Sequence, residues 1–356
     1  MAEKVLMKGN EALAEAALRA GCEAYFGYPI TPQNELAAYM AKRMPQEGGV
    51  YLQAESEIGA INMVYGAAGA GARCMTSTSS PGMSLKSEGI SYIAGADLPC
   101  VIVNVQRGGP GLGGIQPSQA DYWQATRATG HGDFHPIVLA PSTVQEMAGS
   151  INEAFDLADE YRSPVIILVD GLLGQMMEPV QLPEKTSKKA EKPWAVGTDQ
   201  TGRKQNVINS LHLDPYELAA SNNERFERYA VISKKEQRVD EYLVDDADYV
   251  IVAFGACARV ARTAVDKARE AGIKAGLIRP ITLVPFPVDA IEAAIPHTKA
   301  FLSVEMNMGQ MVEDVRLIVA GRRPVEFFGH AGGVIPTPSE VLDQLKALQD
   351  SKGGDA

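Results

Sequence analysis

Short apolar runs alternate along this chain with longer stretches whose apolar residues recur at helical spacing. The runs before residue 170 predict six strands, at 24–26, 49–54, 73–77, 99–105, 136–139 and 164–169. Apolar strands that alternate with helices are typical of a parallel sheet covered by helices on both faces. The first half of the chain is therefore predicted to be an α/β domain built on a doubly wound parallel sheet.

A second, smaller set of alternating elements begins near residue 249. Its predicted strands cover 249–254, 275–278, 300–304 and 325–328. Between the two sets, residues 183–245 are polar and only weakly periodic, so they read as a linker or crossover that packs against the rest of the chain. The expected organisation is a domain at 1–182, a linker at 183–245 and a smaller α/β domain at 246–356.

Composition and charge narrow the class of protein. The 356 residues are 46% hydrophobic and 22% charged, which is ordinary for a globular chain with two full cores. The net charge of −11 and the lack of a dense basic cluster outside one short segment argue against nucleic-acid binding. No apolar run approaches the roughly 20 residues that span a bilayer, and no charged-then-apolar leader opens the chain. We therefore expect a cytoplasmic protein with no membrane contact.

The cysteines and histidines predict no metal site in this chain. Cys22, Cys74, Cys100 and Cys257 are too widely spaced for a zinc or iron–sulfur motif. The histidines at 131 and 135 have no third ligand at a suitable spacing. If the protein takes part in redox chemistry, its electron carrier must lie on another chain.

Three features follow predicted strands, at the edge where ligands bind in parallel sheets. Thr31 is expected to cap a helix whose first residue is Pro32, which would leave a helix N-terminus facing the strand end. Either Glu55 or Glu57 should face a buried site, because the helix that follows is almost entirely apolar. Each feature also has a simpler interpretation, as a good helix start and as an acidic partner of a helix dipole.

The third feature is Arg107, which comes directly after a buried strand and precedes a glycine-rich loop. Its planar guanidinium suits a carboxylate or phosphate bound through two hydrogen bonds, although a surface arginine on a flexible loop is an equal alternative. The loop also contains a formal Gly-x-Gly-x-x-Gly at Gly109, Gly111 and Gly114. We reject a dinucleotide site, because Pro110 discourages a helix and no acidic residue ends a strand about 20 residues later.

Four segments together resemble the α subunit of 2-oxoacid:ferredoxin oxidoreductases, and the match spans nearly the whole chain. They are Tyr-Pro-Ile-Thr-Pro at 28–32, Glu57 heading an Ala/Gly-rich helix, Thr-Ser-Thr-Ser-Ser-Pro-Gly at 76–82 and Asn-Val-Gln-Arg-Gly-Gly-Pro at 104–110. Two further segments most resemble the branched-chain (2-oxoisovalerate) members, Met-Lys-Gly-Asn-Glu at 7–11 and Gly-Leu-Leu-Gly-Gln-Met-Met at 171–177.

The resemblance implies a thiamine diphosphate pyrimidine-binding domain followed by a transketolase-C-terminal-like domain. It assigns to Glu57 the carboxylate that hydrogen-bonds the aminopyrimidine ring and activates the cofactor. Thr31 and Arg107 would bind the 2-oxoacid, and these three residues are the expected catalytic set. The implied cofactor-binding residues are Ile30, Glu57, Ser79, Ser80 and Pro81.

The resemblance also implies that this chain holds only half of an active site. The Gly-Asp-Gly segment with a later Asn that binds the diphosphate is missing, and Val-Asp-Gly at 169–171 is the nearest string. A β subunit would supply the diphosphate site, Mg²⁺ and a [4Fe–4S] cluster, and γ and ferredoxin-like δ subunits would complete the complex. The expected reaction converts a 2-oxoacid and coenzyme A to acyl-CoA and CO₂ while reducing ferredoxin. An NAD-linked arylglyoxylate-type enzyme and a non-catalytic scaffold remain as alternatives, and the sequence does not fix the 2-oxoacid.

Overall fold

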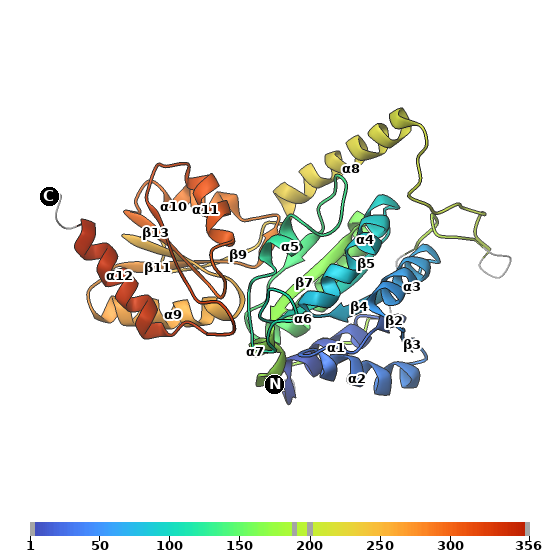
Figure 1. Ribbon diagram of the computed structural model, residues 1–356, viewed down its shortest axis with the longest axis horizontal. Coiled ribbons are helices and arrows are strands. Elements are labelled where there is room, and N and C mark those ends of the chain that lie inside the picture. Colours follow the sequence, from blue (N-terminus) through green and yellow to red (C-terminus); the bar gives the residue numbers. More distant parts are fainter. Residues whose placement is uncertain (1–3, 187–190, 198–201, 353–356) are drawn as a thin grey trace.

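Two α/β bodies lie side by side in the computed structural model, which describes residues 4–186, 191–197 and 202–352 (Figure 1). The first is built on a seven-stranded sheet with the order β12-β6-β7-β5-β4-β2-β3. Its strands are β2 (Ala24–Gly27), β3 (Val50–Gln53), β4 (Cys74–Thr78), β5 (Cys100–Gln106), β6 (Ile137–Leu139), β7 (Pro164–Asp170) and β12 (Thr282–Val284). All pairs are parallel except β12 with β6. The six strands predicted for the first half are therefore confirmed.

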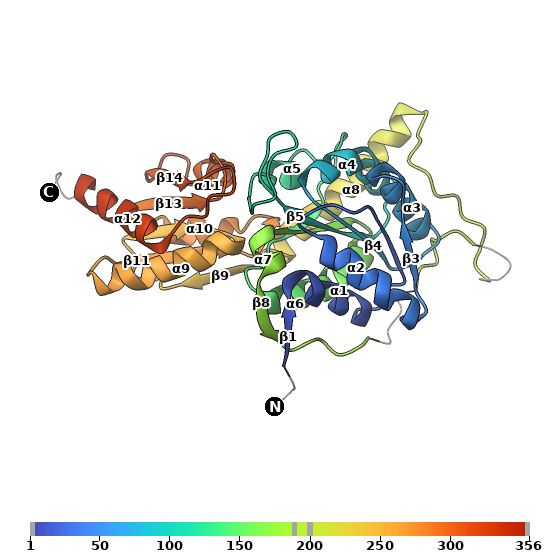
Figure 2. The same cartoon turned by 60° about the horizontal axis from the view of Figure 1, so that its bottom comes forward.

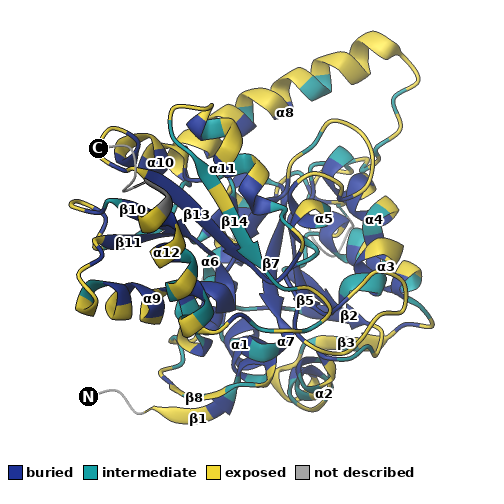
Figure 3. Cartoon of the chain, turned by 60° about the vertical axis from the view of Figure 1, so that its left-hand side comes forward, coloured by how far each residue is buried: buried dark blue, intermediate teal, exposed yellow. Residues whose placement is uncertain are grey.

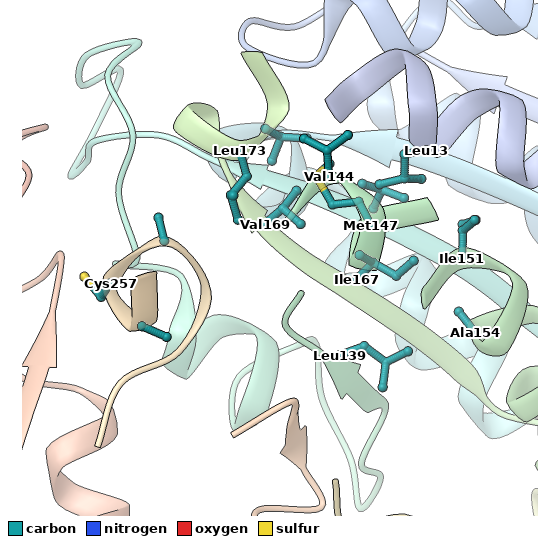
Figure 4. Close-up of a cluster of buried hydrophobic side chains, with 14 of the residues drawn as sticks. Leu13, Leu139, Val144, Met147, Ile151, Ala154, Ile167, Val169, Leu173 and Cys257 are labelled. Carbon is teal, nitrogen blue, oxygen red and sulfur yellow. The ribbon is translucent and has the colours of Figure 1, made fainter. Parts of the chain in front are cut away.

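Helices cover both faces of this sheet, as its apolar strands predict. β5 and β7 are buried along their whole length, because they lie inside the sheet between two helical layers. One layer contains α1 (Gly9–Arg19) and α6 (Val144–Tyr161), whose apolar side chains pack on β6 and β7 (Figure 4). The other contains α3 (Glu57–Gly69) and α4 (Ser80–Gly95). The remaining elements of this body are α2 (Asn34–Arg43), the 3₁₀ helix η1 (Met44–Glu47), α5 (Tyr122–Thr126) and α7 (Gly171–Gln175).

The second body is built on a five-stranded sheet with the order β14-β13-β10-β11-β9. Its strands are β9 (Val239–Tyr242), β10 (Tyr249–Val252), β11 (Ala275–Pro280), β13 (Ala300–Glu305) and β14 (Val325–Gly329). The accompanying helices are α9 (Gly255–Glu270), α10 (Val288–Ala294), α11 (Met311–Val319) and α12 (Pro338–Lys352). The pattern predicted four of the strands and missed β9, a short half-exposed strand that pairs antiparallel with β11.

The two bodies share a strand and a buried polar junction. β12 comes from the second half of the chain, yet it extends the first sheet by pairing with β6. Gln119 is fully buried at the junction, where its side chain donates to the Phe254 carbonyl (2.8 Å) and accepts from the Met306 amide (3.1 Å). Because Gln119 is buried, moving the two bodies apart would leave its side-chain amide without hydrogen-bond partners. The junction therefore favours one orientation of the two bodies.

The segment between the bodies contains a long helix, α8 (Pro215–Lys235). Its C-terminal half packs on the first body, where Arg225 is buried and donates to the Gly95 carbonyl (3.2 Å). The N-terminal end projects away, and most of the helix is exposed (Figures 1 and 3). At the opposite side of the first body, β1 (Val5–Lys8) and β8 (Met177–Val180) form a two-stranded antiparallel ribbon (Figure 2). No helix among the described residues is both long enough and apolar enough to cross a bilayer.

The prediction that Thr31 caps a helix beginning at Pro32 was wrong. α2 begins at Asn34, after Gln33 as its N-cap residue, and the Thr31 hydroxyl accepts from the Asn34 side chain (3.1 Å). Gln33 is fully buried, accepts from the Ser77 hydroxyl (2.6 Å) and donates to the Tyr28 carbonyl (3.3 Å). These bonds hold an extra turn between β2 and the helix, and they displace the helix start by two residues.

Candidate active site

The predicted site residues lie at the carboxyl ends of four strands that are neighbours in the sheet, β5, β4, β2 and β3. Thr31 follows β2, Glu57 opens the helix after β3, and Arg107 comes directly after β5. Ser79 lies between β4 and α4, and residues 80–82 form the first turn of α4. Because the carboxyl ends of parallel strands meet at one edge of a sheet, these residues from distant parts of the chain share one edge.

Glu57, not Glu55, is the buried carboxylate at this edge. It is the first residue of α3, and only 6% of it is exposed, whereas Glu55 is exposed. The Ser56 hydroxyl caps the same helix by accepting from the Gly59 amide (3.1 Å). Among the described residues, none donates a hydrogen bond to the Glu57 carboxylate. A carboxylate in this position can accept a hydrogen bond from a ligand.

Gly82 explains how Glu57 fits against the neighbouring helix. A Cβ atom at this position would lie 2.7 Å from a Glu57 carboxylate oxygen and 2.2 Å from the Thr78 hydroxyl. No side chain fits there, so glycine is required for the close approach of α4 to the carboxylate. The main-chain carbonyl of Glu57 accepts from the ammonium of Lys86, one turn further along α4 (3.4 Å).

Arg107 is buried with part of its guanidinium unpaired. Its terminal nitrogens donate to the carbonyls of Thr31 and Leu112, both at 3.0 Å, while its buried Nε has no partner. The two bonds hold the guanidinium between the turn after β2 and the glycine-rich loop. A free Nε–H beside a terminal nitrogen is the edge that receives a carboxylate through two hydrogen bonds.

The start of α4, residues 79–82, carries both hydrogen-bonded and free polar groups. Ser80 donates to Asp121 (2.6 Å) and accepts from the Arg107 amide (3.1 Å), so its hydroxyl positions the main chain at Arg107. The Ser79 hydroxyl is buried without a partner. Pro81 and Ile30 are partly exposed at the same edge of the sheet. Ser79 therefore retains a free polar group for a ligand, and Ser80 does not.

A cavity of about 480 Å³ opens beside Thr31. Its apolar walls come from both bodies, with Ile115 and Leu172 from the first and Ile335 from the second. Glu35 also lines it, and its hydrogen bonds to Gln175, Lys8 and Asn10 lower the pKa of that carboxyl although burial acts to raise it. Of the predicted catalytic residues, Thr31 lines this mostly apolar cavity, and Arg107 adjoins it through its hydrogen bond to the Thr31 carbonyl.

Sequence reasoning missed two groups at this edge. Asp121 accepts from Ser80 and from Asn104 (2.9 Å), and burial raises the pKa of its carboxyl. Lys86 was missed because a lysine in a helix normally indicates a solvated face. The available signal was its position four residues after Gly82, which places both on one face of α4. Within the described residues, no group of three or more His, Cys, Asp or Glu is arranged to hold a metal ion.

Comparison with known families identifies the chain. The profile of "pyruvate flavodoxin/ferredoxin oxidoreductase, thiamine diP-bdg" matches residues 15–241, which is more than half of the chain. The chain belongs to this family. Residues 247–341 match a second profile, "pyruvate:ferredoxin oxidoreductase core domain II", so the resemblance found in the sequence is confirmed.

Relatives of this family member match over nearly its full length. Subunit VorB of the ketoisovalerate oxidoreductase of Methanothermobacter thermautotrophicus is 50% identical over 344 residues, which cover 96% of this chain and 97% of VorB. Subunit KorA of the 2-oxoglutarate synthase of the same organism is 38% identical and covers 97% and 99% of the two chains.

Solved structures agree with the fold. The 2-oxoglutarate:ferredoxin oxidoreductase of Magnetococcus marinus, solved with 2-oxoglutarate, coenzyme A and succinyl-CoA bound, superposes with a TM-score of 0.86 at 26% identity. The match covers 97% of this chain but only 65% of that one. A split-gene transketolase superposes with a TM-score of 0.57 at 13% identity, which supports the transketolase-like fold alone.

Proposed function

We propose that this chain is the α subunit of a thiamine diphosphate-dependent 2-oxoacid:ferredoxin oxidoreductase acting on a branched-chain 2-oxoacid. The complex oxidatively decarboxylates the 2-oxoacid, transfers the acyl group to coenzyme A and reduces ferredoxin in the cytoplasm. The observation that carries this proposal is the pairing, at one sheet edge, of the buried residue Glu57 with the buried and unpartnered Nε of Arg107.

The geometry around Glu57 fits the aminopyrimidine of thiamine diphosphate. The carboxylate lacks a donor among the described residues, and the glycine at position 82 lets α4 pack closely against it. The Ser79 hydroxyl is a second free buried group nearby in the loop that opens α4. When bound, thiamine diphosphate supplies the nucleophilic carbon for the keto group and the electron sink for loss of CO₂. Glu57 would hold a proton on the pyrimidine ring, and Ile30 and Pro81 would pack beside it.

Arg107 and Thr31 fit the carboxylate end of the substrate. The free Nε edge of Arg107 would bind the carboxylate, while its bonds to the carbonyls of Thr31 and Leu112 hold the guanidinium in place. Thr31 lies at the mouth of the apolar cavity, so its hydroxyl would orient the keto acid there. Ile115, Leu172 and Ile335 favour an apolar side chain, in line with the name of the 50% identical relative.

The exposed surface near the site supports a partner subunit. Ile58 and Leu85 are half-exposed on α3 and α4, and Leu112 and Ile115 are largely exposed on the glycine-rich loop. Asp170 belongs to the segment that comes nearest to a diphosphate motif. Its carboxylate caps α7 instead, by accepting from the amides of Leu172 and Leu173. A β subunit would therefore cover this surface and supply the diphosphate site, Mg²⁺ and a [4Fe–4S] cluster. Separate γ and ferredoxin-like δ subunits would carry electrons to ferredoxin.

The test uses the assembled complex, with pyruvate, 2-oxoisovalerate and 2-oxoglutarate as substrates and either ferredoxin or NAD as acceptor. We expect 2-oxoisovalerate and ferredoxin to give the highest kcat/KM. Glu57→Gln should abolish oxidation of all three acids, whereas Glu55→Gln, a matched change at an exposed position two residues earlier, should not. Normal oxidation by Glu57→Gln would overturn the proposal, and NAD reduction without ferredoxin would favour the arylglyoxylate-type alternative.

A further inference from the structure

Asp121 is an acidic residue at the site edge that the proposed chemistry does not yet use. It lies directly before α5 and is partly buried. One of its carboxylate oxygens, Oδ2, accepts from the Ser80 hydroxyl (2.6 Å) and from the Asn104 side chain (2.9 Å). Its main-chain amide donates to the Gln106 side chain (3.1 Å). Asp121 therefore joins the start of α4 to the end of β5, directly before Arg107.

The main chain at Arg107 lies just beyond the sheet. The pairing of β5 with β4 ends at Asn104, and its pairing with β7 ends at Gln106. Arg107 is the next residue, and its amide donates to the Ser80 hydroxyl (3.1 Å). The hydroxyl thus supports the main chain where the sheet stops, at the residue whose side chain belongs to the site.

The Ser80 hydroxyl has one hydrogen and two acceptors within reach. Oδ2 of Asp121 lies at 2.6 Å and the carbonyl of Arg107 at 3.2 Å. The carboxylate is both the closer and the stronger acceptor, so the hydrogen points to Asp121. A lone pair of the hydroxyl oxygen then faces the Arg107 amide. Without Asp121 the hydrogen would turn toward the Arg107 carbonyl, and the hydroxyl would lose the bond that orients it.

The side chain of Arg107 depends on this main-chain support for its direction. One of its terminal nitrogens is held by the carbonyl of Leu112, a residue that is itself 85% exposed on the glycine-rich loop. An arginine side chain is long and flexible, so a small turn of the main chain becomes a large displacement at the guanidinium. Displacements of about 1 Å in a binding group are enough to weaken a site strongly.

We propose that Asp121 is a positioning residue for Arg107. By orienting the hydroxyl of Ser80 it fixes the main chain at Arg107, and so it aims the free Nε edge at the substrate carboxylate. The inference rests on the proposed role of Arg107 toward the 2-oxoacid. Asp121 acts through hydrogen bonds rather than through its charge. Asparagine, whose amide oxygen can accept the same two bonds, should therefore replace it.

The test measures kcat and KM for 2-oxoisovalerate in the assembled complex, with thiamine diphosphate, Mg²⁺, coenzyme A and ferredoxin at saturation. Asp121→Ala should raise KM about tenfold with kcat within about threefold of wild type, because a misdirected arginine binds the carboxylate less well. Asp121→Asn should keep KM within about twofold of wild type. Ser80→Ala removes the same link from the other side, so it should raise KM as much as Asp121→Ala. The double variant should be no worse than either single variant, since both act along one path.

Asp314→Ala is the matched control. Asp314 lies on α11 and accepts from the Tyr122 hydroxyl (2.6 Å) and from Arg127 (2.6 Å). Its loss therefore disturbs the residue next to Asp121 but leaves the bond between Asp121 and Ser80 in place. Urea unfolding should show a loss of stability in this variant, whereas its KM should equal that of wild type.

The outcomes separate this inference from the proposed function. If Asp121→Ala does not assemble, Ser80→Ala carries the test. An unchanged KM in these variants, additive effects in the double variant, or an equal rise of KM in Asp121→Asn or Asp314→Ala would overturn the inference alone. An unchanged KM in Arg107→Met would instead overturn the proposed role of Arg107.

Discussion

Two buried glutamates, one in each body of the molecule, differ in the hydrogen bonds that their carboxylates accept. Glu305 ends β13 before α11, and its carboxylate accepts from the side chains of Ser303 and Asn307 and from three main-chain amides of residues 310–312. Glu57 opens α3, and none of the described residues donates to its carboxylate. Both side chains are almost entirely buried. Burial alone therefore does not distinguish a structural carboxylate from a candidate functional one, and the hydrogen-bond partners supply the difference.

The largest expected effect separates activity from stability at Glu57. Glu57→Gln should lower kcat/KM of the assembled complex on the order of 10³-fold, about 4 kcal/mol of barrier, because an amide cannot hold the proton as a carboxylate does. The free energy of unfolding should change by less than about 1 kcal/mol, since no internal hydrogen bond is lost. Steady-state kinetics and urea unfolding measure the two quantities. A large loss of stability would mean that Glu57 is a structural carboxylate like Glu305.

Glu305→Ala should show the reverse pattern. It leaves three main-chain amides without an acceptor, two of them in buried hydrogen bonds, so the free energy of unfolding should fall by about 3 kcal/mol. The folded fraction should keep its kcat, because Glu305 lies in the second body and its hydrogen-bond partners include none of the predicted catalytic residues. Urea unfolding of the variant, together with kcat per active site, tests this. Loss of kcat with unchanged stability would contradict the comparison.

The carboxylate of Asp170 accepts internal hydrogen bonds, yet burying its charge still lowers the stability of the fold. Burial raises the pKa of its carboxyl from 3.8 to about 6, although the amides of Leu172, Leu173 and Ala256 act in the opposite direction. Between these two pKa values the folded chain binds more protons than the unfolded chain, so stability falls as pH rises through this range. The contribution of Asp170 to the free energy of unfolding should be about 1.5 kcal/mol larger at pH 5 than at pH 7.5.

Asp170→Asn isolates that contribution. The amide oxygen retains the acceptor for the α7 amides but no longer titrates in this range. The difference in unfolding free energy between wild type and variant should therefore favour wild type by about 1.5 kcal/mol more at pH 5 than at pH 7.5. Urea titrations at the two pH values measure it. A pH-independent difference would show that the Asp170 charge is not buried as described.

The sequence predicted the sheets better than the contacts that complete them. Apolar runs located the six first-half strands, because a parallel sheet buried on both faces leaves a purely apolar pattern. It did not predict β12, whose three residues pair with a strand more than 140 positions earlier, since such pairing has no local signal. The apolar pattern left Glu55 and Glu57 open and the family resemblance chose Glu57, which is the buried residue of the two. It also missed Lys86, because only the packing of α4 on α3 makes that lysine buried.

Thr31 gives the smallest expected effect, because its side chain is only partly buried and its hydroxyl already has a hydrogen-bond partner within the chain. Thr31 is partly exposed and its hydroxyl already accepts from the Asn34 side chain (3.1 Å), so a substrate would gain little from it compared with Glu57 or Arg107. Thr31→Val should raise KM for the 2-oxoacid by about fivefold, about 1 kcal/mol, with kcat within about twofold of wild type. Asn34→Ala removes the partner but keeps the hydroxyl, so KM should stay unchanged in steady-state assays of the complex. A loss of kcat/KM in Thr31→Val as large as that expected for Glu57→Gln would contradict the comparison. In that case an existing internal hydrogen bond would not indicate that a polar group is unimportant for catalysis.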